Sequence, residues 1–134
     1  MMAFVADNSV VVPWFVNNQA NDYTRAMLRR SAGETVHVPA VWPAEFANVI
    51  LSLTHRRSLK PAKVPGILGE LEQMDIDTDQ ALPSVRALFD LGRRFALGAY
   101  DASYLELAMR MRLPLAACDG ALRKAADRAG ILLT

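Results

Sequence analysis

The sequence predicts an α/β fold: a three-layer sandwich in which a central, mostly parallel sheet is covered by helices on both faces. Short apolar runs rich in strand-forming residues alternate with longer segments of helical periodicity, the order that builds a covered parallel sheet. The 134 residues, 52% hydrophobic and 22% charged, have the composition of one globular domain with a sizeable core. No internal repeat or linker divides the chain. We therefore expect residues 1–134 to form a single domain.

The first elements follow from the apolar run "AFVA", which predicts a strand over residues 3–6. The segment "NSVVVPWFV" after it predicts a short helix interrupted near Pro13, since proline lacks the backbone N–H that a helix interior uses. "NDYTRAMLRRSAG" predicts a second helix that ends at Gly33, a residue typical of helix ends.

The middle of the chain repeats this order. "TVHVP", residues 35–39, predicts a strand, and residues 41–57 predict a helix with Pro43 in its first turn. One face of this helix collects its large apolar side chains: Trp42, Phe46, Val49, Ile50 and Leu53. A further helix over residues 61–74 leads to "DIDTD", which predicts a brief strand or loop.

The remaining elements continue the alternation to the last residue. The pattern predicts helices over residues 82–97, 100–111 and 119–130, and strands over residues 113–118 and 131–134.

Charge and composition exclude several classes of protein. The net charge of +1 is too small for a general nucleic-acid binder, so any polyanion must be held locally. No apolar run is long enough to cross a membrane, and no basic residue precedes the first apolar stretch as in a signal peptide, so we expect a cytoplasmic protein with no membrane association. One cysteine, Cys118, excludes an internal disulfide and a cysteine-based zinc site.

Two predicted strands end in a carboxylate: Asp7 follows the first strand, and Asp119 follows the strand over residues 113–118. Ligands of open α/β sheets bind outside the carboxyl ends of the strands, so these two side chains are expected at one edge. The alternative is that each Asp, together with Asp101 before the helix that follows it, caps a helix by accepting backbone N–H bonds.

Glu45 has no capping explanation, because it lies inside a predicted helix on the stripe that faces the core. A buried carboxylate must be paired, protonated or bound to a cation. A salt bridge to an arginine is one explanation. If Glu45 instead converges with the three Asp side chains, their repulsion requires a divalent cation. Carboxylates favour Mg²⁺ or Mn²⁺ over zinc.

Longer stretches of the sequence resemble a known family. "FVADNSV", "PAVWPAEFANVI", "AYDASYLELAMRMRLPLAACDGALRKAA" and "GILLT" are similar to PIN-domain proteins, above all to VapC-type ribonuclease toxins of type II toxin–antitoxin pairs. The resemblance covers essentially the whole chain. It implies a PIN-like fold and a Mg²⁺- or Mn²⁺-dependent endoribonuclease that hydrolyses RNA phosphodiesters, commonly in tRNA or rRNA. Housekeeping RNA processing, or a PIN-like scaffold that binds without cutting, are the alternatives.

The resemblance also assigns residues. It implies that Asp7, Glu45, Asp101 and Asp119 are the catalytic and metal-binding carboxylates, and that Ser9 hydrogen-bonds behind them. Ala117 departs from the family pattern, since many relatives carry Thr or Ser there. The implied partners are a small cognate antitoxin and a second copy of the chain in a homodimer.

Basic residues are the candidate RNA contacts, although such residues on helices more often form solvated faces or intrahelical pairs. They fall into three groups: Arg25, Arg29 and Arg30; Arg56, Arg57 and Lys60; Arg93 and Arg94.

Overall fold

Four parallel strands form the central sheet of the computed structural model, which describes residues 2–118 and 120–134. They are β1 (Ala3–Ala6), β2 (Thr35–Val38), β3 (Ile76–Thr78) and β4 (Leu115–Ala116), in the order β3-β2-β1-β4. The register aligns Phe4 with Val36, Val36 with Ile76, and Val5 with Leu115. Every described strand pair is parallel, as the alternation of strands and helices predicts.

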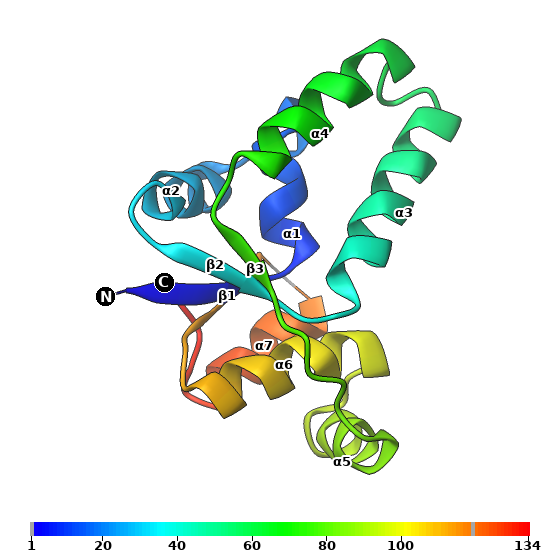
Figure 1. Ribbon diagram of the computed structural model, residues 1–134. Helices are drawn as coiled ribbons and strands as arrows, with labels where there is room; N and C mark the ends of the chain where they lie inside the picture. Colours follow the sequence, from blue (N-terminus) through cyan, green and yellow to red (C-terminus); the bar gives the residue numbers. More distant parts are fainter. Residues whose placement is uncertain (1, 119) are drawn as a thin grey trace.

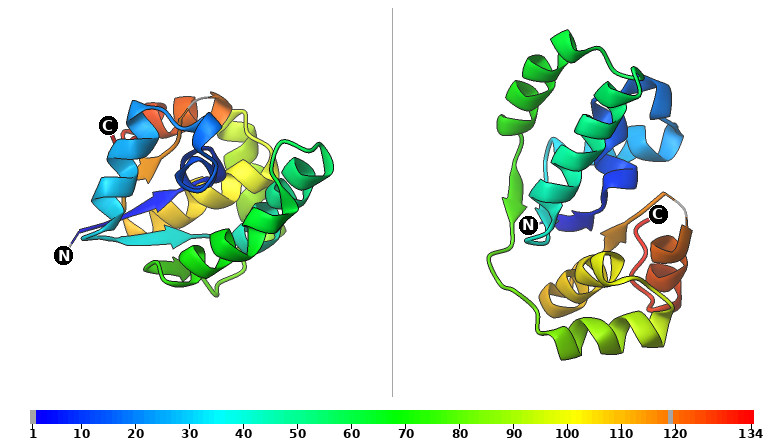
Figure 2. Two further views of the ribbon diagram at one scale, coloured as in Figure 1. Left: turned by 90° about the horizontal axis from the view of Figure 1, so that it is seen from above. Right: turned by 90° about the vertical axis from the view of Figure 1, so that its right-hand side faces the viewer.

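Helices cover both faces of this sheet (Figure 1, Figure 2), which confirms the predicted three-layer sandwich. One face carries α1 (Asn8–Val11), α2 (Asp22–Ser31), α3 (Trp42–His55), α4 (Val64–Glu72) and the short 3₁₀ helices η1 (Val12–Trp14), η2 (Asn17–Gln19) and η3 (Pro61–Lys63). The other face carries α6 (Ala99–Met111) and α7 (Gly120–Arg128), with α5 (Val85–Phe95) packed on α6. None of the described helices combines the length and apolar character that crossing a bilayer requires.

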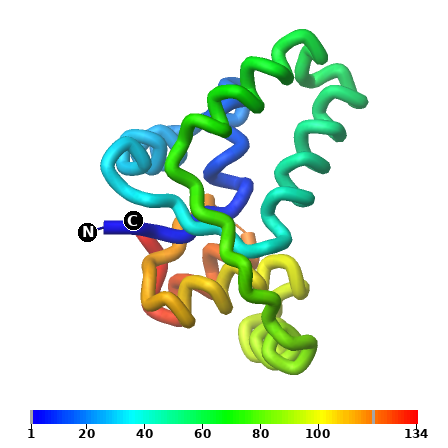
Figure 3. The backbone as a smooth tube through the Cα atoms, in the orientation of Figure 1, coloured from blue at the N-terminus to red at the C-terminus, as the bar shows by residue number. Residues whose placement is uncertain are grey.

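The strand order contains a switch in direction next to β1. From β1 the chain adds β2 and then β3 on one side, and it then crosses back, through the long path visible in Figure 3, to place β4 on the other side of β1. Phe4, Val5 and Ala6 are fully buried because β1 has a neighbouring strand on each side and helices on both faces. Ligands of such sheets bind beside the carboxyl ends of the strands at this switch.

The ends of several helices are set by side chains that the sequence shows. Asn21 and Thr24 form a reciprocal capping box at the start of α2. Ser84 accepts the Ala87 N–H at 3.1 Å, so α5 starts at Val85 rather than at residue 82. Near Pro13 the chain changes from α1 to η1, as predicted.

The C-terminal strand is a wrong prediction. Residues 131–134 make one isolated bridge, between Leu132 and Leu115, rather than a strand. The Leu115 N–H donates to the Ile131 carbonyl at 2.8 Å, and the Leu133 N–H donates to the Leu115 carbonyl at 2.9 Å. The strand beside this segment, β4, is only two residues long, so the ladder has no room to continue.

Candidate functional site

A polar cavity of about 240 Å³ is lined by residues from the end of β1, from α3 and from α6. Figure 1 shows that the end of β1 and the first turns of these two helices lie close together. We call this cavity the carboxylate pocket, and it is lined by Asp7, Asn8, Glu45, Asn48, Val49, Asp101 and Tyr104. Three of the four carboxylates expected from the sequence therefore share one cavity, at the strand end where open α/β sheets bind ligands. The fourth, Asp119, lies outside the described residues.

Asp7 is held from behind by Ser9. The residue occupies the N-cap position of α1, but its side chain makes no capping hydrogen bond. Instead, the Ser9 hydroxyl donates to Asp7 Oδ1 at 2.5 Å, and the Cys118 N–H donates to the Ser9 hydroxyl oxygen at 3.0 Å. Capping does not account for this contact between the Ser9 hydroxyl and Asp7. The serine links the end of β1 to the segment after β4.

Glu45 lies in the first turn of α3 and is half-buried. Its Oε1 accepts a 2.8 Å hydrogen bond from the Tyr104 hydroxyl, and it forms no ion pair with any described residue. A salt bridge to an arginine therefore does not account for this carboxylate. Tyr104 lies on α6 and is 98% buried, so its hydrogen bond holds Glu45 along one wall of the pocket.

Asp101 enters the pocket from the first turn of α6. The helix starts at Ala99, one residue earlier than predicted from residues 100–111, because Gly98 is its N-cap residue, and no side chain caps it. Asp101 is therefore not a cap. Since residues three apart lie on the same face of a helix, Asp101 and Tyr104 both face α3.

The electrostatics of the pocket favour protonation when no cation is bound. Burial raises the pKa of Asp7 from 3.8 to about 7; the Ser9 hydrogen bond opposes this rise, and the charges of Asp101 and Glu45 add to it. Burial likewise raises the pKa of Glu45, against the opposing hydrogen bond from Tyr104. Burial also raises the pKa of Asp101. Near neutral pH the protein holds these negative charges together at a cost in free energy.

The donor set fits a hard divalent cation in its chemistry, because Mg²⁺ and Mn²⁺ prefer carboxylate oxygens and retain several waters. A bound cation would also offset the repulsion from Asp101 and Glu45, which adds to the rise that burial causes in the pKa of Asp7. In residues 2–118 and 120–134, however, no three His, Cys, Asp or Glu side chains are already gathered as a ligand set.

Three polar lining residues were not predicted as part of the site from the sequence: Asn8, Asn48 and Tyr104. Asn8 accepts the Trp42 indole N–H at 2.8 Å, which fixes the start of α3 against the end of β1. Asn48 follows Glu45 by three residues, and Tyr104 follows Asp101 by three. The helical spacing of these pairs was the available signal, since polar side chains three apart on one face meet the same space.

The predicted arginine contacts separate into paired and unpaired groups, and none of them lines the carboxylate pocket. Arg25 pairs with Asp22 at 3.3 Å, and Arg30 pairs with Glu34 at 2.8 Å. Arg94 lies over the Phe95 ring. The others make no ion pair with a described residue: Arg29, Arg56, Arg57, Lys60 and Arg93.

The fold and the pocket define an α/β domain with an acidic site at the switch point of a parallel sheet. The model of the PIN domain family matches residues 4–128, and the chain belongs to this family, whose members are generally metal-dependent nucleases. Among solved structures, PAE2754 from Pyrobaculum aerophilum superposes with a TM-score of 0.67 at 16% identity, over 92% of this chain and 79% of that one. This likeness supports the fold. A search of curated proteins finds no match.

Proposed function

We propose that this PIN domain is a Mg²⁺- or Mn²⁺-dependent endoribonuclease and the toxin of a VapBC-type pair, acting on tRNA or rRNA. The observation that carries the nuclease proposal is the convergence of Asp7, Glu45 and Asp101 in one pocket. Burial raises the pKa of each, and neighbouring carboxylates add to the rise for Asp7 and Glu45, so that a bound cation would offset the cost of ionising them. The toxin role rests on the sequence resemblance.

Each carboxylate has a proposed task. Asp7 and Asp101, with Asp119, would hold the cation, which supplies an activated water and stabilises charge on the attacking and leaving oxygens. Glu45 would accept a hydrogen bond from that water and orient it toward the phosphate. Ser9 keeps Asp7 from rotating away, and Tyr104 does the same for Glu45.

The proposed partners are an RNA strand, a cognate antitoxin and a second copy of this chain. The antitoxin would cover the carboxylate pocket with an arginine, whose guanidinium pairs well with carboxylates. The apolar segment "VVVPWFV", residues 10–16, is nearly all buried and belongs to the core, so it is not the surface proposed for the antitoxin. The α3 and α4 pair leaves Leu51 and Leu68 exposed, so these helices are the better candidate surface.

The test is cleavage of a tRNA and total-RNA panel by purified protein with Mg²⁺ or Mn²⁺. Chelator and Asp7→Asn should each abolish cleavage, whereas Asp90→Asn, an exposed acid on α5, should leave it unchanged. Loss of activity in Asp7→Asn with retained folding supports the carboxylate site.

Two results would contradict parts of this proposal. Absence of cleavage on every RNA, with no Asp7-dependent binding of Mn²⁺, favours a PIN-like scaffold that binds without cutting. Cleavage without association with the product of any adjacent small reading frame favours a nuclease in RNA processing.

A further inference from the structure

A second polar cavity, of about 290 Å³, lies beside the turn between α3 and α4. It is bounded by residues 15–18 on one side and by residues 58–63 on the other, and its polar lining consists of Asn17, Asn18, Ser58, Lys60 and Lys63. We call it the lysine pocket. None of its residues lines the carboxylate pocket.

The positive charge of the lysine pocket is not compensated. Neither of the two segments that form it contains an acidic residue, since residues 8–21 and 46–69 have no Asp or Glu. Lys60 and Lys63 form no ion pair with any residue of the described chain. In a protein whose net charge is only +1, this is a local basic field.

Helix stability does not explain the two lysines. Lys60 directly precedes η3, and Lys63 directly precedes α4. Cations near the positive end of a helix are unfavourable, by a few tenths of a kcal/mol or more. Arg56 is different, because it ends α3, where the helix dipole favours a cation. The two lysines, unlike Arg56, therefore lie at helix ends where the helix dipole disfavours a positive charge.

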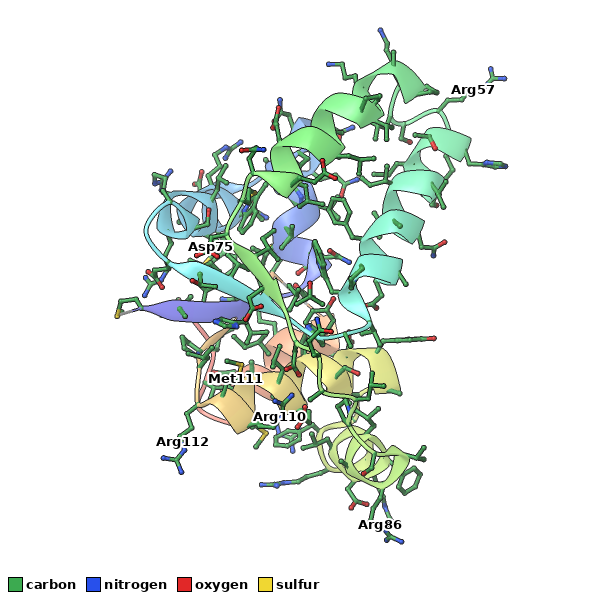
Figure 4. All side chains as sticks on the ribbon, viewed as in Figure 1. Arg57, Asp75, Arg86, Arg110, Met111 and Arg112 are labelled. Carbon is green, nitrogen blue, oxygen red and sulfur yellow. The ribbon has the colours of Figure 1, made fainter. Side chains whose placement is uncertain are left out.

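The turn that carries these lysines is itself strained. Arg57 has a φ of 61°, a left-handed conformation that costs a residue with a side chain roughly 1 kcal/mol. The Leu53 carbonyl holds the turn by accepting both the Ser58 N–H at 2.9 Å and the Leu59 N–H at 3.1 Å. Figure 4, in which Arg57 is labelled, shows its side chain pointing out from the turn into solvent. Ser58 and Lys60 thereby remain beside the cavity.

The lining matches a phosphate group. Two ammonium groups supply charge, while the amides of Asn17 and Asn18 and the Ser58 hydroxyl supply hydrogen-bond donors. Both pockets lie along α3: Glu45 is near its start and His55 is its last residue, a rise of about 15 Å. A single-stranded RNA with one phosphate at the carboxylates reaches the turn within a few nucleotides.

We propose that the lysine pocket binds a backbone phosphate of the RNA substrate, a few nucleotides away from the bond that is cut. This inference rests on the proposed nuclease function for the identity of the ligand. Lys60 and Lys63 are its charged contacts, and Asn17, Asn18 and Ser58 are its hydrogen-bonding groups.

The experiment measures binding of a fluorescein-labelled single-stranded RNA by anisotropy, with chelator present so that nothing is cut. The double variant Lys60→Gln/Lys63→Gln is compared with Arg86→Gln/Lys124→Gln, which removes the same charge from exposed sites on α5 and α7. Loss of one phosphate contact should weaken binding about tenfold and lower the slope of log affinity against log salt by about 0.7. The control variant should change neither quantity by a comparable amount.

Two outcomes would overturn the proposal. One is that the two double variants, both folded, bind the RNA with equal affinity and equal salt slope. The other is that a polyglutamate peptide competes with the RNA for the wild type as well as unlabelled RNA does. The last outcome assigns the pocket to an acidic protein partner. Failure of the nuclease proposal looks different. In that case the wild type binds RNA through the lysines but does not cut it when Mn²⁺ is added.

Discussion

The Tyr104 hydroxyl reaches across the carboxylate pocket from α6 and donates a 2.8 Å hydrogen bond to Glu45 Oε1 on α3. The two residues are 59 positions apart in the sequence, and the bond joins helices from opposite faces of the sheet. Because Oε1 is occupied, Oε2 is the oxygen of Glu45 that remains for a water or a cation. The hydrogen bond also opposes the burial that raises the pKa of Glu45.

Tyr104→Phe should weaken Mn²⁺ binding about tenfold while keeping the fold, because it removes the hydroxyl and retains the buried ring. Titration calorimetry at constant pH measures this affinity directly. Tyr100→Phe, on the exposed face of the same helix, is the matched control. If the two variants bind Mn²⁺ equally well, Tyr104 has only a packing role.

Ser9→Ala should move the acid limb of the cleavage rate against pH, where the rate rises as Asp7 ionises, to higher pH. The Ser9 hydrogen bond lowers the pKa of Asp7, so its loss leaves burial less opposed and the carboxyl protonated over a wider range. The variant also leaves the Cys118 N–H without the hydroxyl acceptor, at a cost of about 1–2 kcal/mol in the free energy of unfolding.

The measurement for Ser9→Ala is the cleavage rate against pH with saturating Mn²⁺, alongside Ser52→Ala, an exposed serine on α3. An unchanged profile, together with unchanged stability, would show that the Ser9 bond to Asp7 does not control that carboxylate.

The metal-free protein should lose stability as pH rises from about 4 to about 7. Folding raises the pKa of Asp7 from 3.8 to about 7, so the folded state binds more protons in this range, and the free energy of unfolding falls with pH. Asp7→Asn removes the contribution of Asp7 to this dependence and leaves those of Glu45 and Asp101. At pH 8 the variant should be more stable than the wild type by up to on the order of 4 kcal/mol, and at pH 4 the two should be alike.

Urea unfolding with chelator at several pH values tests this, with Asp90→Asn as the control for loss of one exposed charge. If the wild type is as stable as Asp7→Asn at pH 8, the ionised carboxylate of Asp7 does not destabilise the folded protein.

Mn²⁺ should raise the melting temperature more at pH 8 than at pH 5.5. The cation requires ionised ligands, whereas the raised pKa of Asp7 keeps this carboxyl protonated in mild acid. Binding near pH 7 should therefore release protons, and the heat of binding should vary with the ionisation enthalpy of the buffer. Equal shifts in melting temperature at both pH values, retained in Asp7→Asn, would place the bound cation elsewhere.

Much of this site follows from local sequence patterns. Asp7 at a strand end and Glu45 on the apolar face of a helix can be recognised in the sequence as unusual, because burying a carboxylate is costly. The two residues come together because β1 and β2, which precede them in the chain, are neighbouring strands. The alternation of strands and helices predicts that these strands are parallel.

What the sequence pattern does not show is contact between distant segments. Tyr104 resembles any core tyrosine until α6 is placed against α3, and the lysine pocket needs residues 15–18 to meet residues 58–63. The C-terminal strand failed for the same reason: residues 131–134 are apolar, but the length of their ladder depends on the two-residue strand beside them.

The carboxylate pocket draws on residues 7, 45 and 101–104, which join only when α6 packs beneath β1. During synthesis the ribosome therefore has to release the chain as far as residue 104 before the pocket exists. Every shorter nascent chain lacks one wall of the site, even if its first strands have already paired. A nascent chain that lacks α6 therefore carries Asp7 and Glu45 but no complete site for the RNA cleavage proposed above.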